Sequence, residues 1–284
     1  MPVLVTSEES IRQRPVQAPG IGRLCFQHVA GRTVLTRASA TSPLKILNPR
    51  SAGASAWAYL ATYGGGLVGG DHLNVRIEVG PGATALVATQ ASTKVYRSEL
   101  RASQELDADV AEDALLVALP DPVTCFAGSD YAQEQRIRLH PSASLVLVDH
   151  LTAGRIESGE RWRFSAYASR TRIWEDDRLV FHDALRLLPA DGDLPRRMGR
   201  FNCVASIVLL GPAMRETASR LLDADSSPPV VRDATCLTSA APLGTGGALL
   251  RIASVSVEQV SVVLREYLSA VPALLGDDPW ARRW

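Results

Sequence analysis

The sequence lacks an excess of charge of either sign and lacks any long hydrophobic run. Its 284 residues include 30 Lys plus Arg and 30 Asp plus Glu, so the formal net charge is zero. Because nucleic acids and anionic membrane surfaces attract basic proteins, this balance argues against both kinds of partner. The longest apolar runs, such as Ser144–Val148 and Ile207–Leu210, are much shorter than the roughly 20 residues that cross a bilayer. The first residues, MPVLVTSEESIRQRP, have no apolar stretch typical of a secretory signal, so we expect a cytoplasmic protein.

Cysteine is scarce, and neither cysteine nor histidine occurs at metal-binding spacing. The four cysteines are far apart in the chain, at Cys25, Cys125, Cys203 and Cys236. Without an export signal, we expect them to be reduced thiols that pack as small apolar groups. No C-x-x-C, H-x-x-x-H or H-E-x-x-H pattern involves these cysteines or the five histidines. The sequence therefore predicts no metal site and no tightly bound cofactor.

Motifs for nucleophilic catalysis are also missing. The chain has no G-x-S-x-G elbow. Cys125 lies where no helix is predicted, so it lacks the helix N-terminus that helps a thiol to ionise. The residues contain no complete catalytic constellation, which favours a scaffold or interaction protein over an enzyme.

A glycine-rich stretch from Gly64 to Asp71, GGGLVGGD, formally satisfies the dinucleotide-binding pattern G-x-G-x-x-G. That pattern binds a pyrophosphate only where it closes a strand and opens a helix. Here the alternating segment Leu73–Val79 predicts a strand instead. Asp71 also stands where a phosphate-binding loop has its lysine, and its charge would repel a phosphate. The stretch is therefore a backbone feature and not a nucleotide site.

A strand–turn–strand pattern recurs three times, which indicates a mainly β protein. The first strands of the three copies end at Val79, Val110 and Leu139, which lie 31 and 29 residues apart. Three turn residues follow each of them, and a second strand begins after Ala83, Ala114 or Ala143. A unit near thirty residues suggests stacked β-helix-like or solenoid-like strand layers, in which each unit covers its neighbour. The alternative is an antiparallel sandwich with similar hairpins, and both architectures are all-β through about Leu188.

Two helices are expected towards the C-terminus, beyond a turn-rich break at Pro189–Pro195. Apolar spacing predicts helices over Pro212–Ala224 and Val257–Ala270, with a strand over Ala248–Val255 between them. Ser256 and Gln259 form the pattern of a capping box, and Pro272 is expected to stop the second helix.

No shift in composition marks a domain boundary, so we expect one domain over residues 1–284. It comprises a β-rich part (20–188), an α-containing part (200–275) and loose ends (1–19 and 277–284).

Several charged residues are candidates for buried ion pairs or for a polar site. Asp149 follows an apolar strand and Glu160 lies in a polar loop, with Arg155 and Arg161 as natural partners. A structural ion pair is the preferred interpretation, and an acid–base pair or a polar channel lining is the functional alternative. Lys94 lies between two β-type segments, and we expect it to pair with Asp71. An unchanged stability and partner binding in Lys94→Met would contradict that pairing.

Four ordered segments resemble the signatures of the UreD (UreH) family of urease accessory proteins. They are GGGLVGGD (64–71), TQASTKVYR (89–97), LPDPVTCF (119–126) and GRIESGERW (154–162). The residues that carry the resemblance are Gly66, Gly69, Gly70, Thr89, Gln90, Asp121, Pro122, Phe126, Gly154, Arg155 and Gly159. Two positions depart from the usual pattern: Ser158 stands where the family often has arginine, and His150 where it often has tryptophan or a similar residue.

The resemblance implies a non-catalytic role in urease maturation. Family members bind urease apoprotein and recruit UreF, with which a dimeric assembly is expected, and UreF recruits the GTPase UreG. Together they deliver nickel, so nickel in transit is implied although no metal is tightly held. The family fold is β-rich, with a solenoid-like stack of strands and two helices. An internal water-filled path is also implied, and Asp71, Asp149 and Glu160 are the candidates for its lining.

Two other functions stay open. A β-helical hydrolase acting on a polysaccharide would use Asp121, Asp149 or Glu160 as acids. A purely structural or interaction protein would have no role with metal. Co-purification with urease and a UreF-like partner favours the accessory protein, and turnover of a glycan favours the hydrolase.

Overall fold

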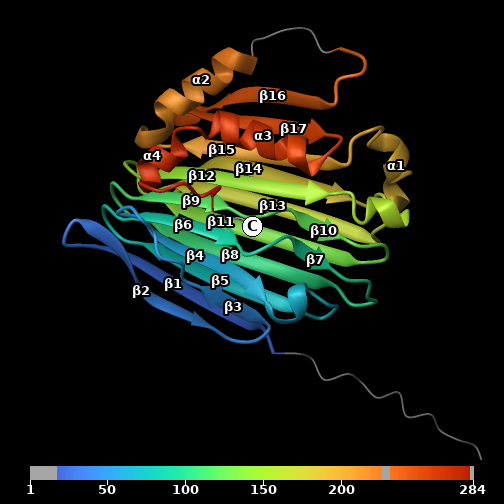
Figure 1. Cartoon of the computed structure of the whole chain (residues 1–284), viewed down its shortest axis with the longest axis horizontal. Coiled ribbons are helices and arrows are strands. Elements are labelled where there is room, and N and C mark those ends of the chain that lie inside the picture. Colours follow the sequence, from blue (N-terminus) through green and yellow to red (C-terminus); the bar gives the residue numbers. More distant parts are fainter. Residues whose placement is uncertain (1–17, 226–230, 282–284) are drawn as a thin grey trace, which may run out of the picture.

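Residues 18–225 and 231–281 are described by the computed structural model of the chain. They form two β-sheets packed face to face (Figure 1). The seven-stranded sheet contains, in spatial order, β14 (Arg178–Leu187), β13 (Ala166–Glu175), β11 (Asp130–Leu139), β8 (Ala102–Val110), β5 (His72–Val79), β1 (Gly20–Val29) and β2 (Arg32–Ala40).

The ten-stranded sheet has a main path of eight strands. In spatial order these are β16 (Cys236–Leu243), β17 (Gly247–Ser254), β15 (Cys203–Leu210), β12 (Ser144–Thr152), β9 (Leu115–Leu119), β6 (Thr84–Thr89), β4 (Ala56–Thr62) and β3 (Leu44–Leu47). Two short strands, β10 (Val123–Cys125) and β7 (Thr93–Val95), extend it from one end of β12.

The helices lie on the ten-stranded sheet, on the face that points away from the other sheet (Figure 1). They are α2 (Arg215–Asp225), α3 (Val257–Tyr267) and α4 (Val271–Leu275), while the short α1 (Leu194–Arg197) lies at one end of the sheets. Single 3₁₀ turns occur at η1 (Tyr63–Gly65), η2 (Ile156–Ser158), η3 (Pro189–Asp191), η4 (Pro212–Met214) and η5 (Gly244–Gly246). Among the described residues, no helix combines the length and apolar character needed to cross a membrane.

Hydrophobic patterning explains the layers. In β5, Leu73, Val75 and Ile77 alternate with polar residues, so only one face of this strand enters the core between the sheets. All five residues of β9 are buried, because one face meets the opposite sheet and the other face meets the helices. A strand covered on both faces is apolar throughout.

The thirty-residue recurrence corresponds to strands that pair in register. Val79 lies opposite Val110, and Val110 lies opposite Leu139, in the parallel strands β5, β8 and β11. The second strands of the units, β6, β9 and β12, pair in parallel in the other sheet. The expectation of an antiparallel sandwich is therefore wrong for this central part.

The expected β-helix-like or solenoid-like stack is not confirmed either. Both sheets are open, and antiparallel strands flank their parallel centres: β2 and β14 in one sheet, and β3 and β15 to β17 in the other. The broader expectation, a mainly β protein with two main helices near the C-terminus, is confirmed.

The C-terminal segment differs from the prediction in two details. The Ser256 hydroxyl accepts a hydrogen bond from the Gln259 backbone at 3.3 Å, but the Gln259 side chain bonds Ser254 and Thr235, so only half of the predicted capping box forms. Helix α3 ends at Tyr267, before Pro272, which instead occupies the first turn of α4.

The expected loose end at 277–284 is packed as far as the structure describes it. The Asp277 carboxylate accepts a hydrogen bond from the Ala52 backbone at 2.8 Å, and Trp280 packs against the core beneath the helices. Residues 282–284, and residues 1–17 of the expected loose N-terminus, lie outside the described residues.

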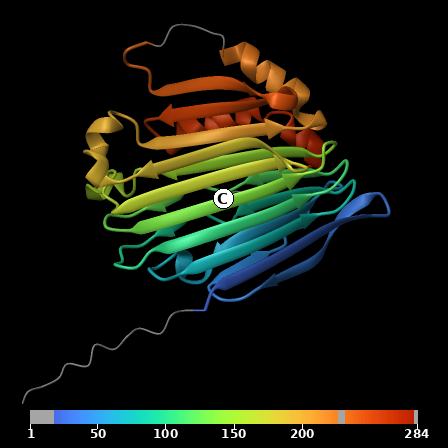
Figure 2. The ribbon, with the colours of Figure 1, turned by 180° about the vertical axis from the view of Figure 1, so that it is seen from behind.

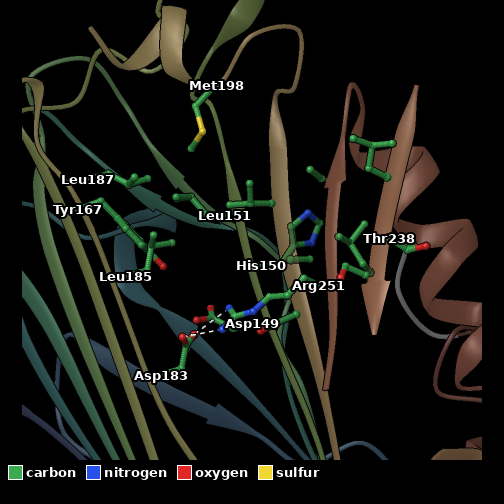
Figure 3. A pocket seen from close by; sticks show the side chains of 17 residues that line it. Asp149, His150, Leu151, Tyr167, Asp183, Leu185, Leu187, Met198, Thr238 and Arg251 are labelled. Carbon is green, nitrogen blue, oxygen red and sulfur yellow. Dashed lines mark hydrogen bonds and ion pairs between the residues drawn. The ribbon is translucent and has the colours of Figure 1, made fainter. Parts of the chain in front are cut away.

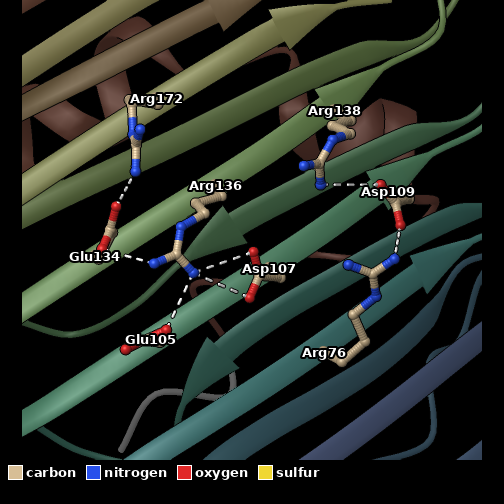
Figure 4. Close-up of polar contacts among 8 residues, drawn as sticks. All are labelled: Arg76, Glu105, Asp107, Asp109, Glu134, Arg136, Arg138 and Arg172. Atoms are coloured by element: carbon tan, nitrogen blue, oxygen red, sulfur yellow. Dashed lines mark hydrogen bonds and ion pairs between the residues drawn. The ribbon is translucent and has the colours of Figure 1, made fainter.

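The outer face of the seven-stranded sheet carries a network of cross-strand ion pairs. No described helix covers this face (Figure 2). Arg136 on β11 lies 3.0 Å from Glu105, 3.4 Å from Asp107 and 2.7 Å from Glu134, and Glu134 also pairs with Arg172 (Figure 4). Pairs of opposite charge on adjacent strands favour this register of the sheet.

Candidate functional site

Three of the four motif segments meet at one end of the ten-stranded sheet. Leu67, in the glycine-rich stretch, forms a β-bridge to Val95, with a hydrogen bond to the Lys94 carbonyl at 2.7 Å and one from the Tyr96 backbone at 2.9 Å. Strand β7 then pairs with β10, and β10 pairs with β12. The fourth motif segment follows directly after β12, so all four lie together at what we call the motif end.

Close backbone contacts explain the glycines of the motif end. A Cβ atom on Gly66 would lie 2.6 Å from the Lys94 carbonyl oxygen. Gly154 has a φ angle of +97°, and a Cβ atom there would lie 2.8 Å from the Cys125 carbonyl oxygen. Gly69 is in close contact with Ser98. Gly70 and Gly159 also have positive φ angles, of 87° and 71°.

An aromatic and ionic cluster joins the second, third and fourth motifs. The rings of Tyr96 and Phe126 meet edge to face at 5.2 Å, and the Arg155 guanidinium lies 4.4 Å from the centre of the Phe126 ring. Arg155 Nε also donates to Glu160 at 3.0 Å, and Glu160 accepts from the Ala127 backbone at 3.2 Å. The predicted pairing of Glu160 with Arg155 is thus confirmed. The hydrogen bonds from Arg155 lower the pKa of Glu160.

Thr89 and Asp121 link the second and third motifs. The Thr89 hydroxyl donates to the Asp121 carboxylate at 3.0 Å and accepts from the Asp121 backbone at 2.7 Å. The Pro122 carbonyl accepts from the Thr93 backbone at 3.0 Å. Gln90, the residue after Thr89, lines a small cavity.

Asp71 closes the glycine-rich turn and does not pair with Lys94. Its carboxylate is buried, and one oxygen accepts from the Val68 backbone at 2.8 Å. Its other oxygen has no hydrogen-bond partner among the described residues. The Lys94 side chain is exposed and forms no ion pair with Asp71 in the described chain, so the expected pairing is wrong.

Three cavities follow one another between the two sheets. The first has a volume of about 600 Å³ and lies where β14 ends the seven-stranded sheet and β15 to β17 continue beyond it (Figure 3). The central and third cavities measure about 50 and 80 Å³. Asp149 and His150 line both the first and the central cavity. The residues that line both the central and the third cavity are Leu60, Thr89, Thr93 and Gln104.

Asp149 lies deep in the protein, and the accessible part of its side chain faces these cavities. Gln133 Nε2 donates to its two oxygens at 2.8 and 3.0 Å, and the Ser169 hydroxyl donates at 2.9 Å. Desolvation raises the pKa of Asp149, although these hydrogen bonds act in the opposite direction. Neither arginine expected as its partner bonds to it in the described part of the chain, since Arg161 binds the Asn202 side chain at 2.6 Å and nearby carbonyls instead.

The other two predicted path residues lie elsewhere. Neither Asp71 nor Glu160 lines any of the three cavities. Sequence reasoning missed Gln133 and Ser169, and it missed the ion pair between Asp183 and Arg251 in the first cavity. Residues alternate between the two faces of β12, so Asp149 lies on the same face as Leu145 and Leu147. This spacing in the sequence indicates that the Asp149 side chain points between the sheets.

The site offers isolated oxygen ligands and no preformed metal centre. Residues 18–225 and 231–281 contain no group of three or more His, Cys, Asp or Glu side chains placed to hold a metal ion. Burial raises the pKa of Cys125 to about 12, so this thiol is not an activated nucleophile.

Comparison with known proteins identifies the family. A family model described as UreD urease accessory protein matches residues 18–284. The chain is 54% identical to urease accessory protein UreD of Sorangium cellulosum, covering 93% of this chain and 84% of that protein. It is 46% identical to urease accessory protein UreD of Anaeromyxobacter, over 93% and 89% of the two chains. It is 35% identical to urease accessory protein D of Arabidopsis thaliana, over 92% and 99%. The chain therefore belongs to the UreD family of urease accessory proteins.

Proposed function

We propose that this chain is a non-catalytic, cytoplasmic metallochaperone scaffold for urease maturation. It binds urease apoprotein as a single domain, recruits UreF and, through UreF, the GTPase UreG, and lets nickel pass between its two sheets. The observation that carries this proposal is the succession of three cavities that share lining residues.

The chemistry of the lining suits an ion in transit. Asp149 presents a carboxylate and Thr89 a hydroxyl oxygen along the central cavity, which Gln133 also lines. Nickel binds imidazole and thiolate more strongly than oxygen ligands, so these groups would hold it weakly. Weak binding lets the ion leave again, whereas a cluster of histidines and cysteines would trap it.

The proposed role of the motif end is to bind partner proteins. Asp71 and Glu160 hold its loops in place through hydrogen bonds to backbone groups, as described above. Beside them, the side chains of Val68 and Leu100 are 49% and 56% exposed. Exposed apolar groups next to a rigid loop cluster support a contact with a partner protein there.

The geometry disfavours the polysaccharide hydrolase. Two of its three candidate acids, Asp121 and Asp149, share only the central cavity of about 50 Å³, and Asp149 without Asp121 lines the first cavity of about 600 Å³. One water molecule occupies about 30 Å³ of liquid, so a sugar ring does not fit between these two acids. The third candidate, Glu160, is paired with Arg155 at the motif end.

Co-expression tests the proposal. The tagged chain is produced with urease subunits, UreF and UreG, purified through its tag, and assayed for nickel-dependent urease activity. We expect all partners to co-purify, and urease activity to require this chain. Full activation without the chain would contradict the proposed function. Co-purification with unchanged nickel loading would instead favour an interaction protein with no metal role.

A further inference from the structure

An ion pair spans the two sheets at the mouth of the first cavity. Arg251 on β17 donates to both carboxylate oxygens of Asp183 on β14, at 2.6 and 2.9 Å. The side chains of Arg251 and Asp183 are 45% and 27% exposed, so the pair lies at the entrance and not in the interior. The guanidinium reaches Asp183 by passing close to Asp149 (Figure 3).

Arg251 places a permanent positive charge at this entrance, because a guanidinium stays charged at all physiological pH values. The hydrogen bonds that Arg251 donates to Asp183 raise the pKa of Arg251, while desolvation lowers it and the charge of Asp149 raises it further. A divalent cation that approaches Asp149 from this entrance therefore meets a fixed positive charge close to that carboxylate. Repulsion at such short range is only partly screened by salt.

We propose that Arg251, held by Asp183, is an electrostatic gate that keeps divalent cations away from Asp149 until the guanidinium is withdrawn. This inference rests on the proposed passage of nickel between the sheets. Asp183 acts here as a positioning residue. It anchors the guanidinium and thereby leaves Asp149 to its neutral partners Gln133 and Ser169.

The two halves of the ion pair should give opposite results. Arg251→Gln removes the positive charge and exposes both carboxylates to a cation. Asp183→Asn keeps the positive charge but releases it, and Asp149 is then the remaining carboxylate of this cavity that it can approach. If the ion pair only stabilised the contact between the two sheets, both substitutions would weaken that contact equally. Both would then change cation binding in the same direction.

The test is Ni²⁺ binding to the purified chain, measured by calorimetry at low ionic strength. Arg251→Gln should bind Ni²⁺ at least about fivefold more tightly than the native chain, and adding Asp149→Asn should abolish this gain. Asp183→Asn should bind no more tightly than the native chain. Arg138→Gln, which removes a charge from the outer face, is the matched control and should behave as the native chain does.

Equal binding by Arg251→Gln and Arg138→Gln, or tighter binding by both Arg251→Gln and Asp183→Asn, would overturn the gate. If the gate fails while Asp149→Asn still lowers urease activation, the proposed function stands without it. If Arg251→Gln gains Ni²⁺ binding through Asp149 but Asp149→Asn leaves urease activation unchanged, the gated site is real and the proposed passage is wrong.

Discussion

Gln133 donates hydrogen bonds to both carboxylate oxygens of Asp149, so a neutral amide holds the acid that faces the cavities. A carboxylate without a directly bound cation keeps its capacity to attract a metal ion. Burial without a directly bonded cation makes the charged form of Asp149 unfavourable in the folded protein. Function and stability therefore place opposite demands on this residue.

Asp149→Asn should reduce nickel-dependent urease activation without weakening the fold. Asparagine has the same shape, and its oxygen still accepts from Gln133, but it carries no charge. We expect activation to fall by at least about tenfold, while the midpoint of thermal unfolding stays equal or rises. Asp113→Asn is the control, because Asp113 is an exposed turn residue. Equal activation by both variants would argue against a role of Asp149 in the path.

The pH dependence of stability should carry the signature of Asp149. Its pKa is raised by folding, so its contribution to stability is fully present below the unfolded pKa of about 3.9 and is lost as the pH rises through the folded value. The free energy of unfolding of Asp149→Asn, relative to the native chain, should therefore increase from acidic to neutral pH. Urea denaturation of both proteins across this range measures it, and a difference that shrinks with rising pH would contradict the raised pKa.

Arg136→Gln should destabilise the seven-stranded sheet. The substitution leaves Glu105, Asp107 and Glu134 without their shared guanidinium, and we expect the free energy of unfolding to fall by about 1 kcal/mol at low salt. Added salt should reduce the deficit because it screens the remaining carboxylates. Arg186→Gln is the control: its single ion pair to Asp191 is highly exposed, so its effect should stay within about 0.5 kcal/mol. Equal losses in both variants would show that the network adds nothing.

Gly66→Ala should disturb the motif end. The added Cβ atom would lie 2.6 Å from the Lys94 carbonyl oxygen, so the bridge between the first two motifs must open or shift. We expect a loss of about 1–3 kcal/mol in the free energy of unfolding and weaker co-purification of partner proteins. Gly244→Ala has open space around its Cβ position and is the control. Unchanged stability and co-purification in Gly66→Ala would contradict the packing account of these glycines.

Local sequence patterns predicted where the strands lie in the chain, but they did not predict how the flanking strands pair. The spacing of Val79, Val110 and Leu139 anticipated residues that lie side by side in parallel strands. The same alternation cannot tell whether flanking strands add in parallel or antiparallel, and the open edges of both sheets were missed for that reason. Pairing at an edge depends on long-range packing and not on local periodicity.

The candidate site was predictable only in part. Asp149 was found because it follows an apolar strand, and the pair of Glu160 with Arg155 was found because the two are close in sequence. The partners Gln133 and Ser169 lie on two strands of the opposite sheet, and Arg251 lies 68 residues from Asp183. The side chains that meet across two packed sheets depend on how one sheet is placed on the other. The sequence of a single strand does not determine that placement.

Filling the central cavity tests whether nickel passes between the two sheets. Ala118 lines this cavity, so Ala118→Val and Ala118→Leu add bulk in two steps, while Ala184→Leu adds the same bulk on the exposed outer face. Nickel-dependent urease activation is measured for each variant that co-purifies its partners at the native level. If nickel passes between the sheets, we expect a graded loss of activation, largest for Ala118→Leu, with Ala184→Leu fully active. Full activation by both Ala118 variants would show that nickel does not travel between the sheets.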